Sequence, residues 1–89
     1  MITDADRRII ETTAAKYGAE RVVLFGSSLS PDQESRDIDI GVAGLEDADF
    51  FTFYGELLLA LSKPVDVVDI SRKSRFTEMV EREGMLLHA

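Results

Sequence analysis

The run Arg21-Val22-Val23-Leu24-Phe25 constrains the fold more than any other stretch of the chain. Its β-branched and aromatic residues follow one another without polar alternation, and Gly26 ends the run. This pattern is typical of a strand that is buried on both faces. The run therefore favours a sheet that is packed with helices.

Apolar residues at helical spacing predict three helices, and two further segments predict strands. The helices are expected at about 4–17, from Asp47 or Asp49 to just before Pro64, and from Ser71 or Ser74 to Gly84. Strict alternation over 36–42 predicts a second strand, and the apolar run 65–70 predicts a third. The expected fold class is α/β, with a small mixed three-stranded sheet packed with helices.

Length and composition fit one small domain. A chain of 89 residues buries only about 60% of its unfolded surface, so residues 1–89 are expected to form a single domain. Hydrophobic residues make up 45% and charged residues 30% of the chain, which is a globular balance. With no cysteine and one histidine, the sequence excludes disulfides, a thiol nucleophile and zinc sites of the usual Cys/His type.

The net charge bears on the partners that the chain can take. A formal charge of -7 should repel nucleic-acid backbones, so direct nucleic-acid binding is not expected. The longest apolar runs, such as 57–61, fall far short of the ~20 residues that cross a bilayer. We therefore expect a soluble, cytoplasmic protein with no membrane partner.

Acidic residues with strand spacing form the first half of a candidate site. Asp37 and Asp39 are two residues apart on the second predicted strand, so their side chains share a face with Cα atoms about 6.5–7 Å apart. Asp66 supplies a third carboxylate if the third strand neighbours the second. An all-oxygen set of this kind suits Mg²⁺ or Mn²⁺, which would also relieve the mutual repulsion of the carboxylates.

The second half of the candidate site is Gly26-Ser27, at the end of the first strand. Gly26 lets a phosphate approach the backbone, and Ser27 offers a hydroxyl and an amide donor if a helical turn begins there. The loop has room for such a turn, with Pro31 in it or interrupting it. Singly, Gly-Ser is usually a turn and Asp-Ile-Asp a solvated strand face, but together they indicate a site for metal and phosphates.

The segments LFGSS, RDIDIGV and PVDVVDI resemble the minimal nucleotidyltransferases of the DNA polymerase beta superfamily, in which Gly-Ser precedes Asp-x-Asp and a later Asp. The resemblance covers nearly the whole chain and implies the nucleotidyltransferase fold. It also implies that Asp37 and Asp39 hold Mg²⁺ and that Asp66 completes the site and assists the attacking hydroxyl. Gly26 and Ser27 would then grip the phosphates of the nucleotide.

The resemblance further implies Mg²⁺-dependent transfer of a nucleoside monophosphate, AMP from ATP or the equivalent from another NTP, to a hydroxyl acceptor. Several family members are antitoxins paired with HEPN-domain RNases, and some transfer AMP onto that partner. This chain departs from the family at Ser28-Leu29-Ser30-Pro31, where a segment rich in arginine is usual. An impaired module that neutralises a partner by complex formation is therefore the alternative, and a purely structural cation site is a third hypothesis.

Other polar residues are expected to lie outside the candidate site. Asp69 has the opposite strand parity to Asp66, so its side chain should face elsewhere. His88 is expected to be solvated near the end of the sequence. Basic residues before the last helix are expected to form an exposed face, namely Arg72, Lys73 and Arg75.

The second predicted helix carries more apolar residues than one core-facing stripe can use. The stripe is expected to contain Phe50, Phe53 or Tyr54, Leu57, Leu58 and Leu61. Phe51 and Leu59 then point away, which suggests a partner protein or a homodimer. The charge of the chain favours a basic partner, as a helical HEPN protein would be. Alternatively, the segment 85–87 covers both side chains.

Overall fold

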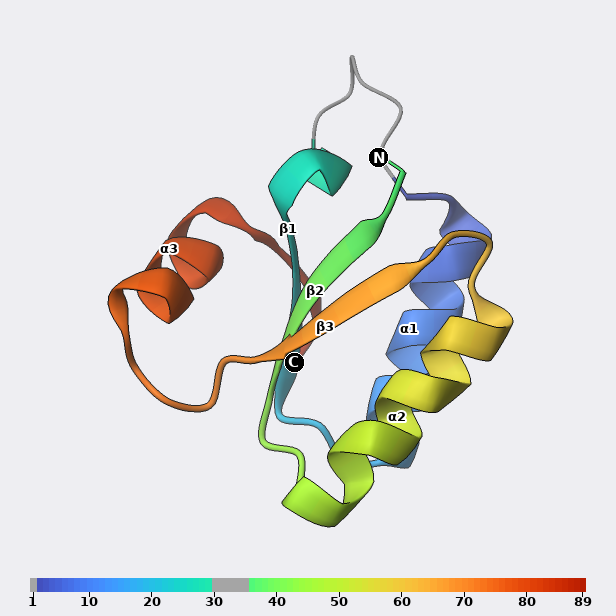
Figure 1. Ribbon diagram of the computed structural model, residues 1–89, viewed down its shortest axis with the longest axis horizontal. Helices are drawn as coiled ribbons and strands as arrows, with labels where there is room; N and C mark the ends of the chain where they lie inside the picture. The colour runs from blue at the N-terminus through green and yellow to red at the C-terminus, as the bar shows by residue number, and fades with distance from the viewer. Residues whose placement is uncertain (1, 30–35) are drawn as a thin grey trace.

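The structure is a computed structural model that describes residues 2–29 and 36–89 of the chain. Its elements are α1 (Asp4–Lys16), β1 (Arg21–Phe25), the 3-10 turn η1 (Gly26–Leu29), β2 (Ile38–Ala43), α2 (Asp47–Ala60), β3 (Val65–Asp69), α3 (Arg75–Glu83) and β4 (Met85–His88). The strands form one sheet, with α1 and α2 on one face and α3 on the other (Figure 1). The chain therefore has the expected α/β architecture.

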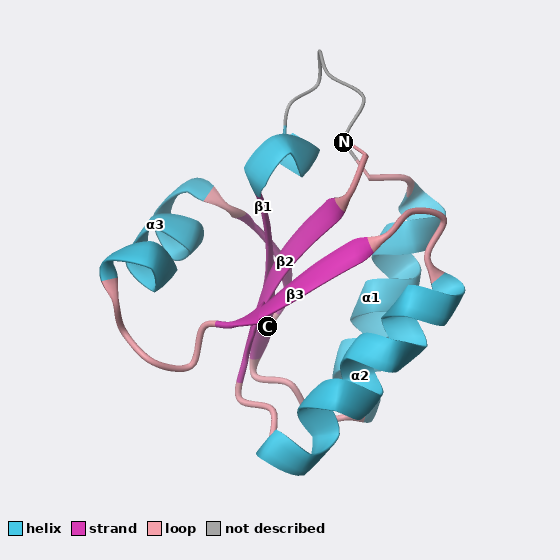
Figure 2. Cartoon of the chain, viewed as in Figure 1, coloured by secondary structure: helices cyan, strands magenta, loops and turns pink. Residues whose placement is uncertain are grey.

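The sheet is mixed and has the strand order β3-β2-β1-β4. Figure 2 labels the first three of these strands. β1 pairs antiparallel with both β2 and β4, whereas β2 and β3 are parallel. Helix α2 makes the crossover that a parallel pair requires. As a result, the C-terminal end of β1 lies at the same end of the sheet as the N-terminal ends of β2 and β3.

The expected number of strands was wrong, because the structure has a fourth strand, β4. This strand extends the sheet beyond β1, and the side chain of Leu87 enters the main core. His88 is half-buried rather than solvated, and its Nε2 lies 3.1 Å from the carbonyl oxygen of Ala19. A strand of four residues directly after a helix offers too short a pattern to be recognised by alternation.

Apolar side chains pack on both faces of the sheet. The smaller cluster, between the sheet and α3, consists of Val23, Ala43, Ile70 and Val80. The main core lies between the sheet and the other two helices and includes Ile10, Ala14, Val22, Leu24, Ile38, Ile40, Val42, Phe53, Leu57 and Leu87. Successive residues of β1 thus enter opposite clusters, which confirms the expectation of a strand buried on both faces.

Side-chain caps define the starts of two helices. The Oγ1 atom of Thr3 accepts a hydrogen bond of 3.1 Å from the backbone N–H of Asp6 at the start of α1. Ser74 and Thr77 form a reciprocal capping box at the start of α3. In contrast, α2 begins at Asp47 after Glu46, whose side chain makes no capping hydrogen bond. Asp47 and Asp49, one of which was expected to cap the start of this helix, both lie in its first turn instead, where their negative charges interact favourably with the helix dipole.

Helix α2 has a partly apolar outer surface. Leu58 was expected in the core but is 53% exposed, because the helix buries only a narrow stripe around Phe53 and Leu57. Phe51 and Leu59 point away as expected and are 78% and 91% exposed, so the C-terminal segment does not cover them. Even with this apolar surface, none of the helices within the described ranges is long and apolar enough to cross a membrane.

A polar contact between α1 and α2 gives the fold a testable dependence on pH. The hydroxyl of Tyr17 donates to Glu56, and Lys16 Nζ lies 2.9 Å from Glu56 Oε1. The hydrogen bonds from Tyr17 and Lys16 lower the pKa of Glu56. A carboxylate whose pKa is lower in the folded state adds stability above its unfolded pKa and loses it as the pH falls through its folded pKa.

Replacing Glu56 by Gln should therefore lower the melting temperature at pH 7, because Gln keeps the shape but loses the charge. The difference from the wild type should shrink progressively below pH 4. Thermal unfolding across this pH range measures the effect. A suitable control is Glu83→Gln, because Glu83 is exposed and lies 4.0 Å from the neighbouring Arg82, at the limit of an ion pair. A difference that does not depend on pH would contradict the assignment.

Candidate active site

Gly26 and Asp39 approach one another closely where β1 ends. Phe25, the last residue of β1, pairs with Asp39 of β2, and Gly26 then turns the chain with φ +72°. A Cβ atom at this glycine would lie only 2.7 Å from Asp39 Oδ2. Glycine at this position thus allows the left-handed backbone conformation and also leaves room for the carboxylate of Asp39.

Two of the predicted carboxylates lie side by side on neighbouring strands. The parallel register pairs Asp39 of β2 directly with Asp66 of β3. The third predicted strand thus neighbours the second, as a shared site requires. Ile38 and Ile40 enter the main core, so Asp39 points to the opposite face, which α3 partly covers. Asp37 precedes the first residue of β2, although the sequence placed it within the strand.

The three carboxylates influence one another electrostatically. Partial burial raises the pKa of Asp39, and the negative charges of Asp66 and Asp37 raise it further. Asp39 is half-buried, whereas the other two are exposed. The arrangement concentrates negative charge at one end of the sheet. A bound divalent cation would relieve the repulsion between these carboxylates.

Helix α3 and the segment after β3 pack on the face of the sheet that carries the carboxylates. Farther along β2, Ile70 and Val80 pack over Gly41, where an added Cβ would lie 2.8 Å from the Ile70 side chain. Closer to the carboxylates, the rings of Phe25 and Phe76 meet edge to face with centroids 5.9 Å apart. At the carboxylate end, Asp37 and Asp66 are exposed and Asp39 is half-buried, with this aromatic pair beside them.

One residue at the site was not assigned to it from the sequence. Tyr54 was considered only for the core stripe of α2, but its hydroxyl donates a long hydrogen bond of 3.5 Å to Asp66 Oδ1. The contact is possible because β3 is the edge strand of the sheet and α2 lies beside it. No local pattern could have revealed this, since it depends on how α2 sits against β3.

The donor chemistry fits a hard cation, although the side chains do not form a ready-made metal site. Within residues 2–29 and 36–89, no group of three His, Cys, Asp or Glu side chains is arranged to hold a metal ion. Rotation of the side chains would have to bring carboxylate oxygens of Asp37, Asp39 and Asp66 together. Oxygen ligands of this kind are the ones that Mg²⁺ and Mn²⁺ prefer.

The predicted phosphate-binding segment is helical at its start. The turn η1 begins at Gly26 and includes Ser27, so the expected helical turn after β1 is confirmed. The departure from the family pattern, Ser28–Pro31, extends beyond this turn, and its last two residues, Ser30 and Pro31, lie outside the described residues.

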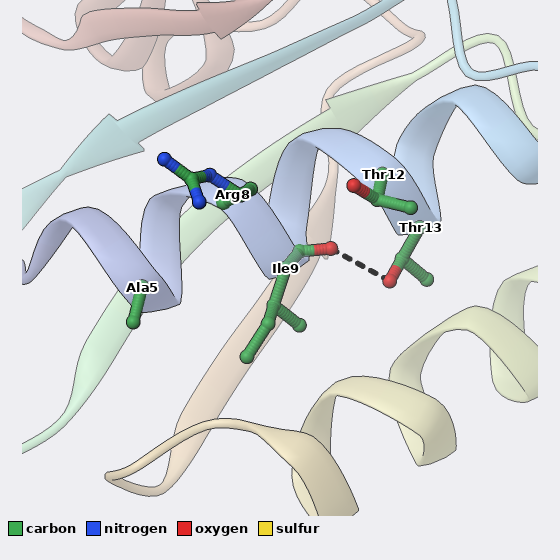
Figure 3. Close-up of a pocket in the computed structure, with 5 residues that line it drawn as sticks. All are labelled: Ala5, Arg8, Ile9, Thr12 and Thr13. Atoms are coloured by element: carbon green, nitrogen blue, oxygen red, sulfur yellow. Dashed lines mark hydrogen bonds between the residues drawn. The ribbon is translucent and has the colours of Figure 1, made fainter.

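A pocket of about 390 Å³ lies elsewhere, on the surface of α1 (Figure 3). Its lining residues all come from this one helix and are Ala5, Arg8, Ile9, Thr12 and Thr13. The Thr13 hydroxyl donates to the backbone carbonyl of Ile9 at 2.7 Å. No carboxylate lines this groove, so it is separate from the acidic site.

The chain is similar to known nucleotidyltransferases. Residues 7–89 match the family model described as "Polymerase beta, Nucleotidyltransferase". A solved structure described as that of a candidate minimal nucleotidyltransferase is 31% identical, with a TM-score of 0.73, and the match covers 91% of this chain and 88% of that one. No curated protein sequence matches the chain at a significant level.

Two toxin–antitoxin structures are also similar. A chain of a toxin–antitoxin complex with AMP-PNP is 25% identical, with a TM-score of 0.72, and the match covers 91% of this chain and 71% of that one. A chain of the tri-AMPylated Shewanella oneidensis HEPN toxin in complex with its MNT antitoxin is 24% identical, with a TM-score of 0.59 and coverage of 91% and 71%. At that identity the second likeness shows the fold alone.

Proposed function

The chain belongs to the polymerase beta nucleotidyltransferase family, and from this we propose that it transfers a nucleoside monophosphate, AMP from ATP, to a hydroxyl group of a partner protein. The observation that carries the proposal is the direct pairing of Asp39 with Asp66, next to the close approach of Gly26. This arrangement places carboxylates beside a helical turn, so a divalent cation and the phosphates of a nucleotide can bind together.

Each residue has a role in the proposed reaction. Asp37, Asp39 and Asp66 would hold Mg²⁺, which when bound neutralises the phosphates and polarises the reacting phosphoryl group. Gly26 and the amide groups of η1 would position the phosphates. The acceptor oxygen attacks the α-phosphorus, the bond from this phosphorus to the bridging oxygen of the β-phosphate breaks, and pyrophosphate leaves. The proton of the hydroxyl passes to Asp66, which is exposed at the edge strand.

We propose a HEPN-type toxin as the partner and acceptor, with the chain acting as its antitoxin. Support comes from the toxin–antitoxin complexes with a similar fold, one of which holds AMP-PNP and another an AMPylated HEPN toxin. The segment Ser28–Pro31 favours a second candidate, a module that neutralises the toxin by binding alone, because the segment contains no arginine for the phosphates.

Transfer of label distinguishes the two candidates. The purified chain, Mg²⁺ and α-labelled ATP are incubated with the HEPN protein of the same genome. We expect label on the HEPN protein and a loss of about 100-fold in rate for Asp66→Asn, since the amide cannot accept the proton. Glu20→Gln is the control, because Glu20 is an exposed carboxylate just before β1, at the end of the sheet opposite to the acidic site. A stable complex that carries no label would support the binding module instead.

A further inference from the structure

The flank of α2 beside the edge strand has exposed apolar side chains that the fold does not use. Phe51 and Leu58 are 78% and 53% exposed and are two helical turns apart, so they lie on the same side of the helix. Leu59, next to Leu58, is 91% exposed. Tyr54 lies between Phe51 and Leu58 on this side and reaches Asp66 of β3. We refer to Phe51, Leu58 and Leu59 as the α2 flank.

The exposed ring of Phe51 contacts one neighbouring aromatic ring. The rings of Phe50 and Phe51 meet at 89° with centroids 5.6 Å apart. Phe50 in turn meets Tyr54 at 88° and 6.3 Å, which forms a row of three aromatic side chains along the helix. An aromatic side chain that is already oriented loses little conformational entropy when a partner covers it, and this is typical of residues that dominate binding energy.

A pocket at the N-terminal end of the α2 flank adds a charge preference. It measures about 220 Å³ and is lined by Asp47, Phe50, Phe51 and Asp69. Two carboxylates beside two aromatic rings match the chemistry of a guanidinium group, which pairs with carboxylates and stacks on ring faces. Asp69 is also fixed in orientation, because its Oδ1 accepts a hydrogen bond of 2.9 Å from the backbone N–H of Ser71.

The α2 flank leads from this pocket to the candidate active site. Strand β3 has Asp69 at the pocket and Asp66 at the site, about 10 Å apart along the strand. Because β3 is an edge strand, a protein seated on the flank would lie beside Asp66. A hydroxyl of that protein could then reach the acidic cluster without any movement of the sheet.

We propose that the α2 flank and its pocket form the docking surface for the partner protein and that an arginine of the partner, flanked by apolar side chains, occupies the pocket. The charge of -7 on the chain and the two aspartates of the pocket favour a basic partner over a second copy of this acidic chain. The identity of the partner as a HEPN protein rests on the proposed function, whereas the position and chemistry of the surface come from α2 and β3.

Calorimetric titration with the purified HEPN protein of the same genome tests the surface. The double variant F51S/L58S should bind at least about 30-fold more weakly, because both apolar contacts are lost. The double variant D47N/D69N should also bind more weakly, and salt should affect its binding less than that of the wild type. The control is Leu86→Ser, because Leu86 is 52% exposed but lies on β4 at the opposite edge of the sheet.

Unchanged melting temperatures of the variants would show that the exposed positions leave the fold intact. Equal binding by the wild type and F51S/L58S would overturn the docking surface alone, while label transfer by the wild type would leave the proposed function standing. No binding by the wild type would overturn both the HEPN partner and this surface. A dimer in sedimentation that F51S/L58S dissociates would assign the surface to a second copy and overturn the proposal.

Discussion

Replacement of Gly26 by alanine is expected to abolish binding of Mn²⁺ and ATP while the protein remains folded. The new Cβ would lie 2.7 Å from Asp39 Oδ2, so the carboxylate would have to turn away from its present position. Asp39 is the central carboxylate of the candidate site, because it pairs with Asp66 and its pKa responds to both other aspartates. The left-handed backbone at Gly26 adds a cost in stability of about 1–2 kcal/mol.

Gly18→Ala separates the two effects of this substitution. Gly18 has nearly the same φ, +70°, but an added Cβ there meets nothing within 4 Å. Both variants should therefore lose about 1–2 kcal/mol of stability, and only Gly26→Ala should lose ligand binding. Calorimetric titration with Mn²⁺ and then with ATP in its presence measures the difference. Equal binding by the two variants would show that the contact between Gly26 and Asp39 has no part in the site.

Three of the four strands and the spacing of the site residues could be predicted, because the alternation of side chains along a strand is visible in neighbouring residues. Alternation places Asp39 opposite Ile38 and Ile40, and the same rule separates Asp69 from Asp66. The pairing of Asp39 with Asp66 could not be predicted in the same way, because the sequence alone did not show that their two strands are neighbours. The register of a parallel pair depends on how the crossover helix returns the chain, and no single segment contains that information.

Features that depend on contacts between distant segments could not be predicted. Tyr54 reaches the site around the edge of β3, and Leu58 lies outside a buried stripe whose width depends on how α2 packs against the sheet. Strand β4 is too short to show a pattern by itself and forms because β1 offers a free edge. In each case tertiary packing, rather than local propensity, decides the outcome.

Gly84, between α3 and β4, is expected to be the glycine whose substitution destabilises the fold most. At Gly84 an added Cβ would lie 2.5 Å from the carbonyl oxygen of Val80 and 2.8 Å from that of Leu24. The added Cβ would also clash with the side chain of Val23 on β1. The two carbonyl oxygens belong to the backbone of α3 and β1, so relief requires movement of whole elements rather than rotation of a side chain.

Gly84→Ala should therefore separate β4 from β1 and cost about 3 kcal/mol or more, which lowers the melting temperature by about 15 °C in a domain of this size. Gly55→Ala is the matched control, because an added Cβ in the middle of α2 meets nothing within 4 Å. That substitution should stabilise the protein by up to about 1 kcal/mol, since alanine favours the helix over glycine. Urea unfolding of both variants gives the two free energies. A Gly84→Ala variant as stable as the wild type would mean that α3 and β4 do not approach β1 as closely as described. It would contradict the position of β4 beside β1.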